Sequence, residues 1–319
     1  MTGHIAPNKA LAIIVCLLPL LLSACSISVF AAATPIPTFF IPPTQTSLPD
    51  TPTPSPVPST LTPTVTLTPT PTDTPLPTPT PTFVAVAAGD VKIPILLYHH
   101  VSDSTPTNRY VVTLKNFRTQ LEKLRELGYT TISMSDLVDV LINGGLLPAH
   151  PVVITFDDGN ADIYDNAFSI MKEMNFTGVL YIVANRLESP DFMHTDQLKE
   201  MIAAGWEIGS HSETHVDLTQ DHDIVRYEEL QSRLDLEEAL GVPVKTFAYP
   251  FGLTNKYVSQ SAQDYGYMAA VGLGTSNEHT WGTLYYLSRR EVQGDYNLDK
   301  FVGLLSTPVA PEVTATPKP

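Results

Sequence analysis

Residues 151–159 read Pro-Val-Val-Ile-Thr-Phe-Asp-Asp-Gly, an apolar run that ends in two adjacent carboxylates and a glycine. The run is short and rich in β-branched residues, so it predicts a buried β-strand. Residues 211–215 read His-Ser-Glu-Thr-His, which spaces two imidazoles four residues apart. One carboxylate and two histidines can hold a divalent metal with open positions, while the second carboxylate stays free as a base. The two stretches together indicate metal-assisted hydrolysis.

Short apolar runs alternate with helical periodicity from residue 90 to residue 305. Strands that are separated by helices form a parallel sheet, and about seven such units in this length predict a closed or nearly closed barrel. The expected fold is therefore α/β, a deformed (β/α) barrel of about seven parallel strands. The predicted strands are 91–98, 130–133, 152–156, 178–183, 206–210, 246–249, 268–272 and 287–292, and the predicted helices are 114–127, 135–142, 164–174, 195–204, 225–240 and 256–265.

The polar motifs share one position in this predicted barrel, because each follows the C-terminal end of a strand. An Asp-Gly pair after a strand is by itself ordinary turn chemistry, and two histidines four residues apart also occur as surface pairs. Parallel barrels assemble their chemistry at the C-terminal edge, so the shared position favours a metal site over both simpler interpretations. The residues that follow strands in this way are His99, Asp157, Asp158, His211, His215 and 250–252.

Three stretches resemble the successive motifs of the polysaccharide deacetylases, the NodB-homology fold of carbohydrate esterase family 4. They are Thr-Phe-Asp-Asp-Gly at 155–159, the segment 205–215 and Phe-Ala-Tyr-Pro-Phe-Gly at 247–252. The resemblance extends over essentially all of residues 92–293. It implies that the metal, commonly zinc with cobalt, nickel or iron as alternatives, is bound by Asp158, His211 and His215.

The same resemblance assigns the remaining catalytic parts. It implies that Asp157 is the general base. It also implies that Tyr249, Pro250, Phe251 and Gly252 line the acetate site, with the Phe251 backbone N–H as an oxyanion donor.

Two family features are missing from their usual places. Phe247 and Ala248 occupy the region where the third motif has an arginine, and no late Leu-x-x-His follows. Leu-Leu-Tyr-His at 96–99 lies at the end of the first predicted strand, which resembles the permuted branch that acts on poly-N-acetylglucosamine. We therefore expect His99 to be the general acid and Arg289 to take the role of the missing arginine.

Other interpretations of these two residues stay open. His99 can instead be a core histidine, and Arg289 can form a plain salt bridge. His100 is the neighbouring candidate for the acid, although successive side chains of a strand point to opposite faces.

The N-terminal region predicts export and anchoring. Residues 10–24 form an apolar run that is short for a membrane span, and Leu-Ser-Ala-Cys at 22–25 resembles a bacterial lipobox. The prediction is a signal peptide at 1–24 and a lipidated N-terminus at 25–33, tethered to the membrane through Cys25 outside the cytoplasm. An ordinary signal peptide is the alternative. The only other cysteine is Cys16, so the folded domain has neither a disulfide nor a thiolate metal site.

Composition separates the folded part from its flanks. Residues 34–89 and 306–319 are rich in proline and threonine and predict a disordered linker and a disordered tail around a domain at 90–305. The net charge of −15 lies almost entirely in that domain. An acidic surface argues against nucleic acid or anionic lipid as a partner.

The sequence as a whole predicts a metal-dependent hydrolase that removes N-acetyl groups from a polysaccharide containing N-acetylglucosamine and releases acetate. Two alternatives use the same site. One is a deacetylase of peptidoglycan or of another amide or ester, and the other is a glycan-binding lipoprotein without catalysis. The base Asp157 beside a full ligand set argues against the last of these, because binding alone does not need a base.

Overall fold

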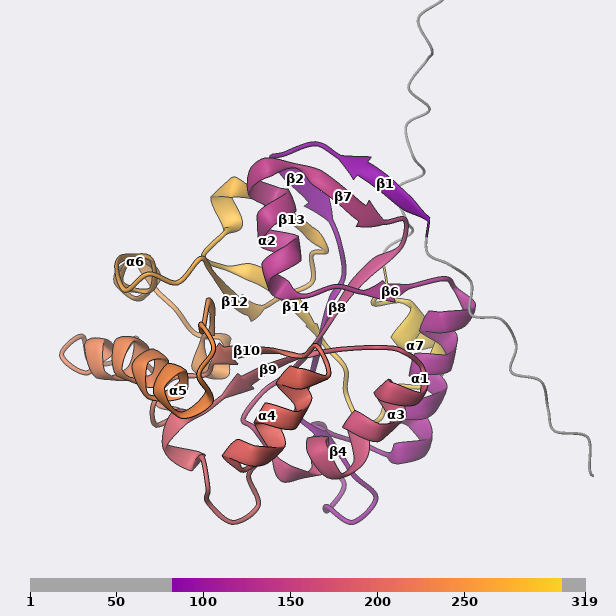
Figure 1. Ribbon diagram of the computed structural model, residues 1–319, viewed down its shortest axis with the longest axis horizontal. Helices are drawn as coiled ribbons and strands as arrows, with labels where there is room; N and C mark the ends of the chain where they lie inside the picture. Colours follow the sequence, from indigo (N-terminus) through magenta and orange to yellow (C-terminus); the bar gives the residue numbers. More distant parts are fainter. Residues whose placement is uncertain (1–81, 306–319) are drawn as a thin grey trace, which may run out of the picture. The chain divides into compact units, whose positions relative to one another are not determined.

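The computed structural model describes residues 82–305, which are built around a closed barrel of seven parallel strands (Figure 1). The ring order is β3-β14-β12-β11-β10-β9-β8, and pairing of β3 with β8 closes it. This confirms the predicted (β/α) barrel of about seven parallel strands. The strands are β3 (Ile95–Tyr98), β8 (Pro151–Phe156), β9 (Val179–Ile182), β10 (Glu207–Ser210), β11 (Thr246–Ala248), β12 (Ala269–Leu273) and β14 (Leu287–Glu291).

The barrel is least regular between β10 and β11. These strands share one registered pair, Ser210 with Phe247. Each of the two strands carries a predicted site motif just beyond this pair, so the chains separate where the site begins. The short strand β6 (Thr130–Thr131) pairs with β8 outside the ring.

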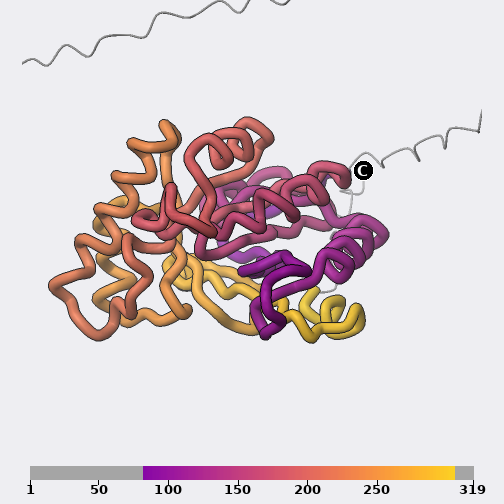
Figure 2. Tube along the Cα trace, turned by 90° about the horizontal axis from the view of Figure 1, so that it is seen from below, coloured from indigo at the N-terminus to yellow at the C-terminus, as the bar shows by residue number. Residues whose placement is uncertain are grey.

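Helices surround the strands, and their ends follow local chemistry. Thr113 caps the first helix by accepting a hydrogen bond from the Asn116 N–H at 3.2 Å. Helices α1 and α7 lie side by side although they are far apart in the sequence (Figures 1 and 2). The helices are α1 (Leu114–Glu126), α2 (Met134–Asn143), α3 (Ser169–Glu173), α4 (Thr195–Ala203), α5 (Ser232–Leu240), α6 (Lys256–Asp264) and α7 (Leu298–Val302), with π-helical turns η1 (Ile163–Phe168) and η3 (Tyr227–Gln231) before α3 and α5.

One end of the barrel is sealed by apolar packing. A buried cluster joins side chains of the barrel interior, such as Val153 and Val271, to Leu137 and Leu141 of α2. The antiparallel pair of β2 (Asp90–Lys92) and β13 (Glu278–Thr280) lies at the same end, where both strands precede a barrel strand. The opposite end, where the strands terminate, remains for polar side chains.

The N-terminal boundary of the folded part differs from the prediction. The predicted linker at 34–89 includes Phe83–Val86, which form strand β1 and pair antiparallel with β7 (Gly145–Pro148). The apolar sequence Phe-Val-Ala-Val pairs with the exposed edge of that segment, so it joins the fold despite its position after a proline tract. The predicted signal peptide, lipidated N-terminus, remaining linker and tail lie outside the described residues. Within 82–305, no helix has the length and apolar character needed to cross a membrane.

Candidate metal centre and catalytic edge

The structure brings the three predicted metal ligands together at the C-terminal edge of the barrel. Asp158 follows β8, whereas His211 and His215 follow β10. Asp158 Oδ1 lies 3.4 Å from His215 Nε2 and 3.9 Å from His211 Nε2. Within residues 82–305, no other set of three His, Cys, Asp or Glu side chains gathers its ligand atoms this closely.

The donor set fits a divalent cation. Tetrahedral zinc at about 2.0–2.1 Å from its ligands places the ligand atoms about 3.3 Å apart. The two separations from Asp158 Oδ1 are 3.4 Å and 3.9 Å, and all three ligand atoms lie within 4.8 Å of one another. His211 Nδ1 lies 2.8 Å from the Ala248 carbonyl oxygen, so Nδ1 donates its hydrogen and Nε2 keeps a lone pair for the metal. Burial and the neighbouring His211 lower the pKa of His215 to about 4, which keeps this imidazole neutral for ligation.

The two histidines converge through an irregular turn rather than through a helix. Ser212 and His215 both adopt left-handed backbone angles, with φ of 67° and 61°, and the Ser212 hydroxyl accepts a hydrogen bond from the His215 N–H at 2.9 Å. Asp158 and Phe251 are left-handed as well, with φ of 73° and 58°. Such conformations cost roughly 1–3 kcal/mol each in residues other than glycine, so the surrounding structure must hold them in place.

The second carboxylate, Asp157, is fully engaged by Arg289. Arg289 Nη1 and Nη2 donate to the two carboxylate oxygens at 2.6 Å and 2.7 Å, and the two side chains are 1% and 3% exposed. The Thr155 hydroxyl and the Gly272 carbonyl also accept from Arg289, each at 3.3 Å. Burial alone disfavours the charged carboxylate, but the charge of Arg289 holds the pKa of Asp157 at about 2. Asp157 is therefore ionised at neutral pH, and its Oδ2 lies 3.6 Å from His211 Nε2.

The two candidate acids have different surroundings. The His99 ring packs against the Tyr110 ring at a centroid distance of 4.8 Å. Burial lowers the pKa of His99, and the fields of Asp157 and Asp158 oppose this shift. The neighbouring His100 instead places Nδ1 2.9 Å from Asp162, and this hydrogen bond raises the pKa of His100. His99 therefore has its ring nitrogens free of the carboxylate that engages His100.

The segment 249–252 forms one side of the site. The Tyr249 side chain is buried and donates a hydrogen bond to the Tyr285 carbonyl at 2.9 Å, so it anchors the segment 249–252 to the barrel. Phe251 is 56% exposed, and its ring lies edge-on to His215 at 4.7 Å. Gly252 is required because a Cβ there would lie 2.5 Å from Leu273 Cγ, at a φ of 68°.

Arg186 is a further residue at this edge that the sequence interpretation missed. Its Nη1 lies 3.6 Å from Asp158 Oδ1, and its guanidinium group lies 5.0 Å from the centre of the Phe192 ring. Arg186 belongs to the turn η2 (Ala184–Arg186), which directly follows β9. The rule that identified the other site residues, a position just past a barrel strand, also applies to it.

Comparison with known proteins agrees with this geometry. The sequence profile of the family described as "Polysaccharide deacetylase" matches residues 145–270. The chain carries a polysaccharide deacetylase domain. The matched part of this deacetylase domain includes the three candidate ligands and Asp157, whereas His99 and Arg289 lie outside it.

Individual relatives of the deacetylase domain are distant. This chain is 26% identical over 181 residues to the putative polysaccharide deacetylase YxkH of Bacillus subtilis. The match covers 56% of this chain and 64% of YxkH, which is less than two thirds of the length of that protein. This chain is 24% identical over 213 residues to a poly-beta-1,6-N-acetyl-D-glucosamine N-deacetylase of Staphylococcus aureus, covering 61% of this chain and 72% of that one. Among solved structures, the Streptococcus pyogenes deacetylase PplD in complex with acetate superposes with a TM-score of 0.64 at 26% identity, over 68% of this chain and 99% of that one.

Removal of both histidine ligands is expected to empty the metal site. His211→Ala with His215→Ala leaves one carboxylate, which cannot hold a transition metal against dilution. The metal content per chain, measured by mass spectrometry after dialysis, should fall from near one to near zero. His100→Ala is the matched control and should keep the metal. Full metal content in the double variant would refute the ligand assignment.

Proposed function

We propose that the protein is a metal-dependent N-deacetylase, which hydrolyses acetamide groups of a polysaccharide containing N-acetylglucosamine and releases acetate. The observation that carries this proposal is the position of Asp157. Its carboxylate is buried, ionised and held by Arg289, and it lies 3.6 Å from the His211 nitrogen that belongs to the ligand set. A site that only binds glycan has no use for such a base.

Because the pKa of Asp157 is low, the proposed reaction needs a bound cation to activate the water. A carboxylate of low pKa is a poor acceptor for a proton from ordinary water. A divalent cation bound by Asp158, His211 and His215 would lower the pKa of water towards neutrality and polarise the acetamide carbonyl. Arg289 then fixes the orientation of Asp157, so that the base meets the attacking water in one geometry.

Two further groups complete the proposed reaction. As the carbonyl carbon becomes tetrahedral, the Phe251 backbone N–H stabilises the negative oxygen, an effect worth about 2.7–4 kcal/mol per donor in comparable sites. The C–N bond breaks readily only if the departing nitrogen receives a proton, since a free amide anion is a very poor leaving group. His99 supplies this proton and leaves a neutral glucosamine amine.

Loss of the proposed acid should slow turnover without disturbing the metal. For His99→Ala we expect kcat to fall about 10²-fold, within the usual range for acid–base groups, at unchanged metal content. The matched variant His100→Ala removes an imidazole that is already paired with Asp162 and should stay within a few-fold of the original enzyme. The reverse result, a slow His100→Ala and a normal His99→Ala, would transfer the role to His100.

We propose poly-N-acetylglucosamine as the substrate class. Support comes from the Staphylococcus aureus relative, which is named for that polymer, and from the histidine that directly follows the first barrel strand, an arrangement that resembles the permuted branch of the family. The test is acetate release from β-1,6-linked N-acetylglucosamine oligomers, with chitin oligomers and peptidoglycan in parallel, with and without added Zn²⁺ or Co²⁺. Absence of metal-dependent release from every one of these polymers would refute the enzymatic proposal.

We also propose that the enzyme works outside the cytoplasm, anchored through lipid on Cys25. This rests on the sequence of residues 10–25 alone. The intact mass of protein extracted from membranes tests it, because a lipidated chain would start at Cys25 and carry the added acyl mass.

A further inference from the structure

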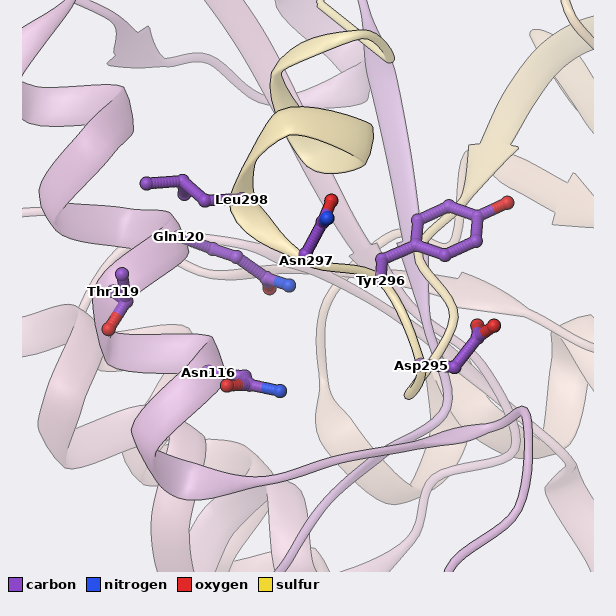
Figure 3. A pocket seen from close by; sticks show the side chains of 7 residues that line it. All are labelled: Asn116, Thr119, Gln120, Asp295, Tyr296, Asn297 and Leu298. Carbon is purple, nitrogen blue, oxygen red and sulfur yellow. The ribbon is translucent and has the colours of Figure 1, made fainter.

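A surface pocket of about 280 Å³ lies outside the catalytic edge, between α1 and the segment that leads into α7. Figure 3 shows Asn116 and Gln120 extending from α1 towards the segment that carries Asn297. The two walls come from distant parts of the chain that the barrel closure brings together. The remaining lining residues are Thr119, Asp295, Tyr296 and Leu298.

Gln120 gives this pocket a buried hydrogen-bond donor. The Gln120 side chain is 98% buried by the fold, since only 2% of the residue is exposed. Its Oε1 accepts a hydrogen bond from the Tyr98 hydroxyl at 2.9 Å, which fixes the orientation of the amide. Among residues 82–305, no acceptor lies within hydrogen-bond distance of Nε2, so its N–H groups are available to the pocket. Because Gln120 lines the pocket, water or a ligand there can supply the acceptor for these N–H groups.

The other lining groups are mostly neutral and of mixed hydrogen-bonding character. Asn116 can donate and accept, and Asn297 uses its Oδ1 to cap α7 at 2.9 Å from the Lys300 N–H, which leaves its NH₂ group as a donor. Asp295, whose Oδ2 lies 3.6 Å from Lys300 Nζ, adds a carboxylate, while Tyr296 and Leu298 add apolar surface. Several neutral donors, a few acceptors and a small apolar surface match a ring that carries hydroxyl or acetamide groups.

The size of the pocket limits its occupant. A volume of about 280 Å³ is just below the usual range for small-molecule sites, enough for about one sugar ring. We infer that this pocket binds one neutral sugar unit of a glycan chain, as a second binding site that is separate from the catalytic centre. The inference rests on the proposed function only for the identity of the polymer.

The connection to the catalytic edge is short along the chain. Tyr98, which holds Gln120, is the last residue of β3 and directly precedes His99. The opposite wall begins soon after β14, the strand that carries Arg289. A sugar unit bound here would therefore keep polymer close to the deacetylating end of the barrel and would raise the affinity for long chains through a second contact.

The test is binding of a β-1,6-linked N-acetylglucosamine hexamer to the full chain by calorimetry, in an Asp157→Asn background that prevents turnover. Asn116→Trp fills the pocket from a half-buried position on α1, and Asn116→Ala removes its hydrogen bonds. We expect the hexamer Kd to rise about tenfold with Asn116→Trp and several-fold with Asn116→Ala.

The matched control is Lys115→Trp. Lys115 is exposed on α1 next to Asn116 but does not line the pocket, so the same bulk is added outside it. This variant should bind the hexamer as the Asp157→Asn parent does. An unchanged Kd in both Asn116 variants, or an equal loss in Lys115→Trp, would overturn the inference. Binding is measured without turnover, so the calorimetric result can be interpreted even if the deacetylase proposal fails. That failure would appear separately, as absence of acetate release.

Discussion

Asp157→Asn is expected to lower kcat for acetate release by about 10³-fold or more while the metal content of the protein stays at its original level. Asparagine has nearly the same shape as aspartate, and its carbonyl oxygen can still accept a hydrogen bond from Arg289. Its amide cannot take a proton from water. The activity lost per folded molecule therefore reports proton transfer. Because the change also leaves the buried Arg289 charge without its counterion, the folded fraction is measured in the same sample. The measurement is steady-state acetate release at saturating metal, together with metal analysis of the same sample.

The adjacent carboxylate provides the control for this variant. Asp158→Asn makes the same chemical substitution at the next residue. Asp158, however, belongs to the ligand set, and its Oδ1 lies 3.4 Å from His215 Nε2. This second variant should lose metal affinity and recover part of its activity at high metal concentration. Asp157→Asn should not recover. Recovery of Asp157→Asn by added metal would exchange the roles of base and ligand.

Arg289→Met should shift the pH dependence of the reaction and destabilise the fold. Without the guanidinium group, burial dominates and raises the pKa of Asp157 above its present value of about 2. The base is then protonated over a wider acidic range, so the acidic limb of the kcat/KM profile should move to higher pH. Breaking one partner of a buried pair typically costs about 3–5 kcal/mol, which urea unfolding would detect.

The pH dependence of stability should also change sign. In the original protein the folded pKa of Asp157, about 2, is below its ordinary value of 3.8. The pair therefore stabilises the fold above about pH 4, and this contribution is lost as pH falls towards 2. In Arg289→Met the folded pKa is raised instead, so ionisation of Asp157 destabilises the fold as pH rises.

Arg289→Lys is the informative companion, because it keeps a positive charge but loses the two-point contact. Its acidic limb should lie between those of the original protein and Arg289→Met. If the limb stays in place in Arg289→Met, then Arg289 does not set the protonation of the base, and its role is packing against Tyr181.

The barrel itself was predictable from the sequence. All seven strands of the ring overlap predicted segments, and only β8 and β12 extend one residue beyond them, because buried parallel strands read as short apolar runs between amphipathic helices. The predicted strand 91–98 is divided into β2 and β3, since Pro94 lacks the N–H that a continuous ladder needs. Strand β1 was missed because four residues after a proline tract carry little periodicity.

The site was predictable to the extent that it follows from one rule. The ends of parallel strands meet at one edge, so Asp158, His211 and His215 were expected to be neighbours. The contact of Arg289 with Asp157 was a hypothesis from a missing motif residue, and the strand order does not specify which inward side chain reaches which carboxylate. The α1–α7 pocket gave no sequence signal, because its walls are joined only by closure of the ring.

The left-handed backbone of four site residues has a consequence for how selection acts on this chain. Folding alone would favour glycine at Asp158, Ser212, His215 and Phe251, since glycine adopts these angles without steric cost. Each position instead carries a side chain, and Phe251 is exposed and contributes little to the core. Stability and chemistry therefore make opposing demands at these positions, and the residues that are present are those that a catalytic role would retain. The left-handed backbone angles therefore indicate a functional role for these four residues, and this argument does not depend on similarity to other proteins.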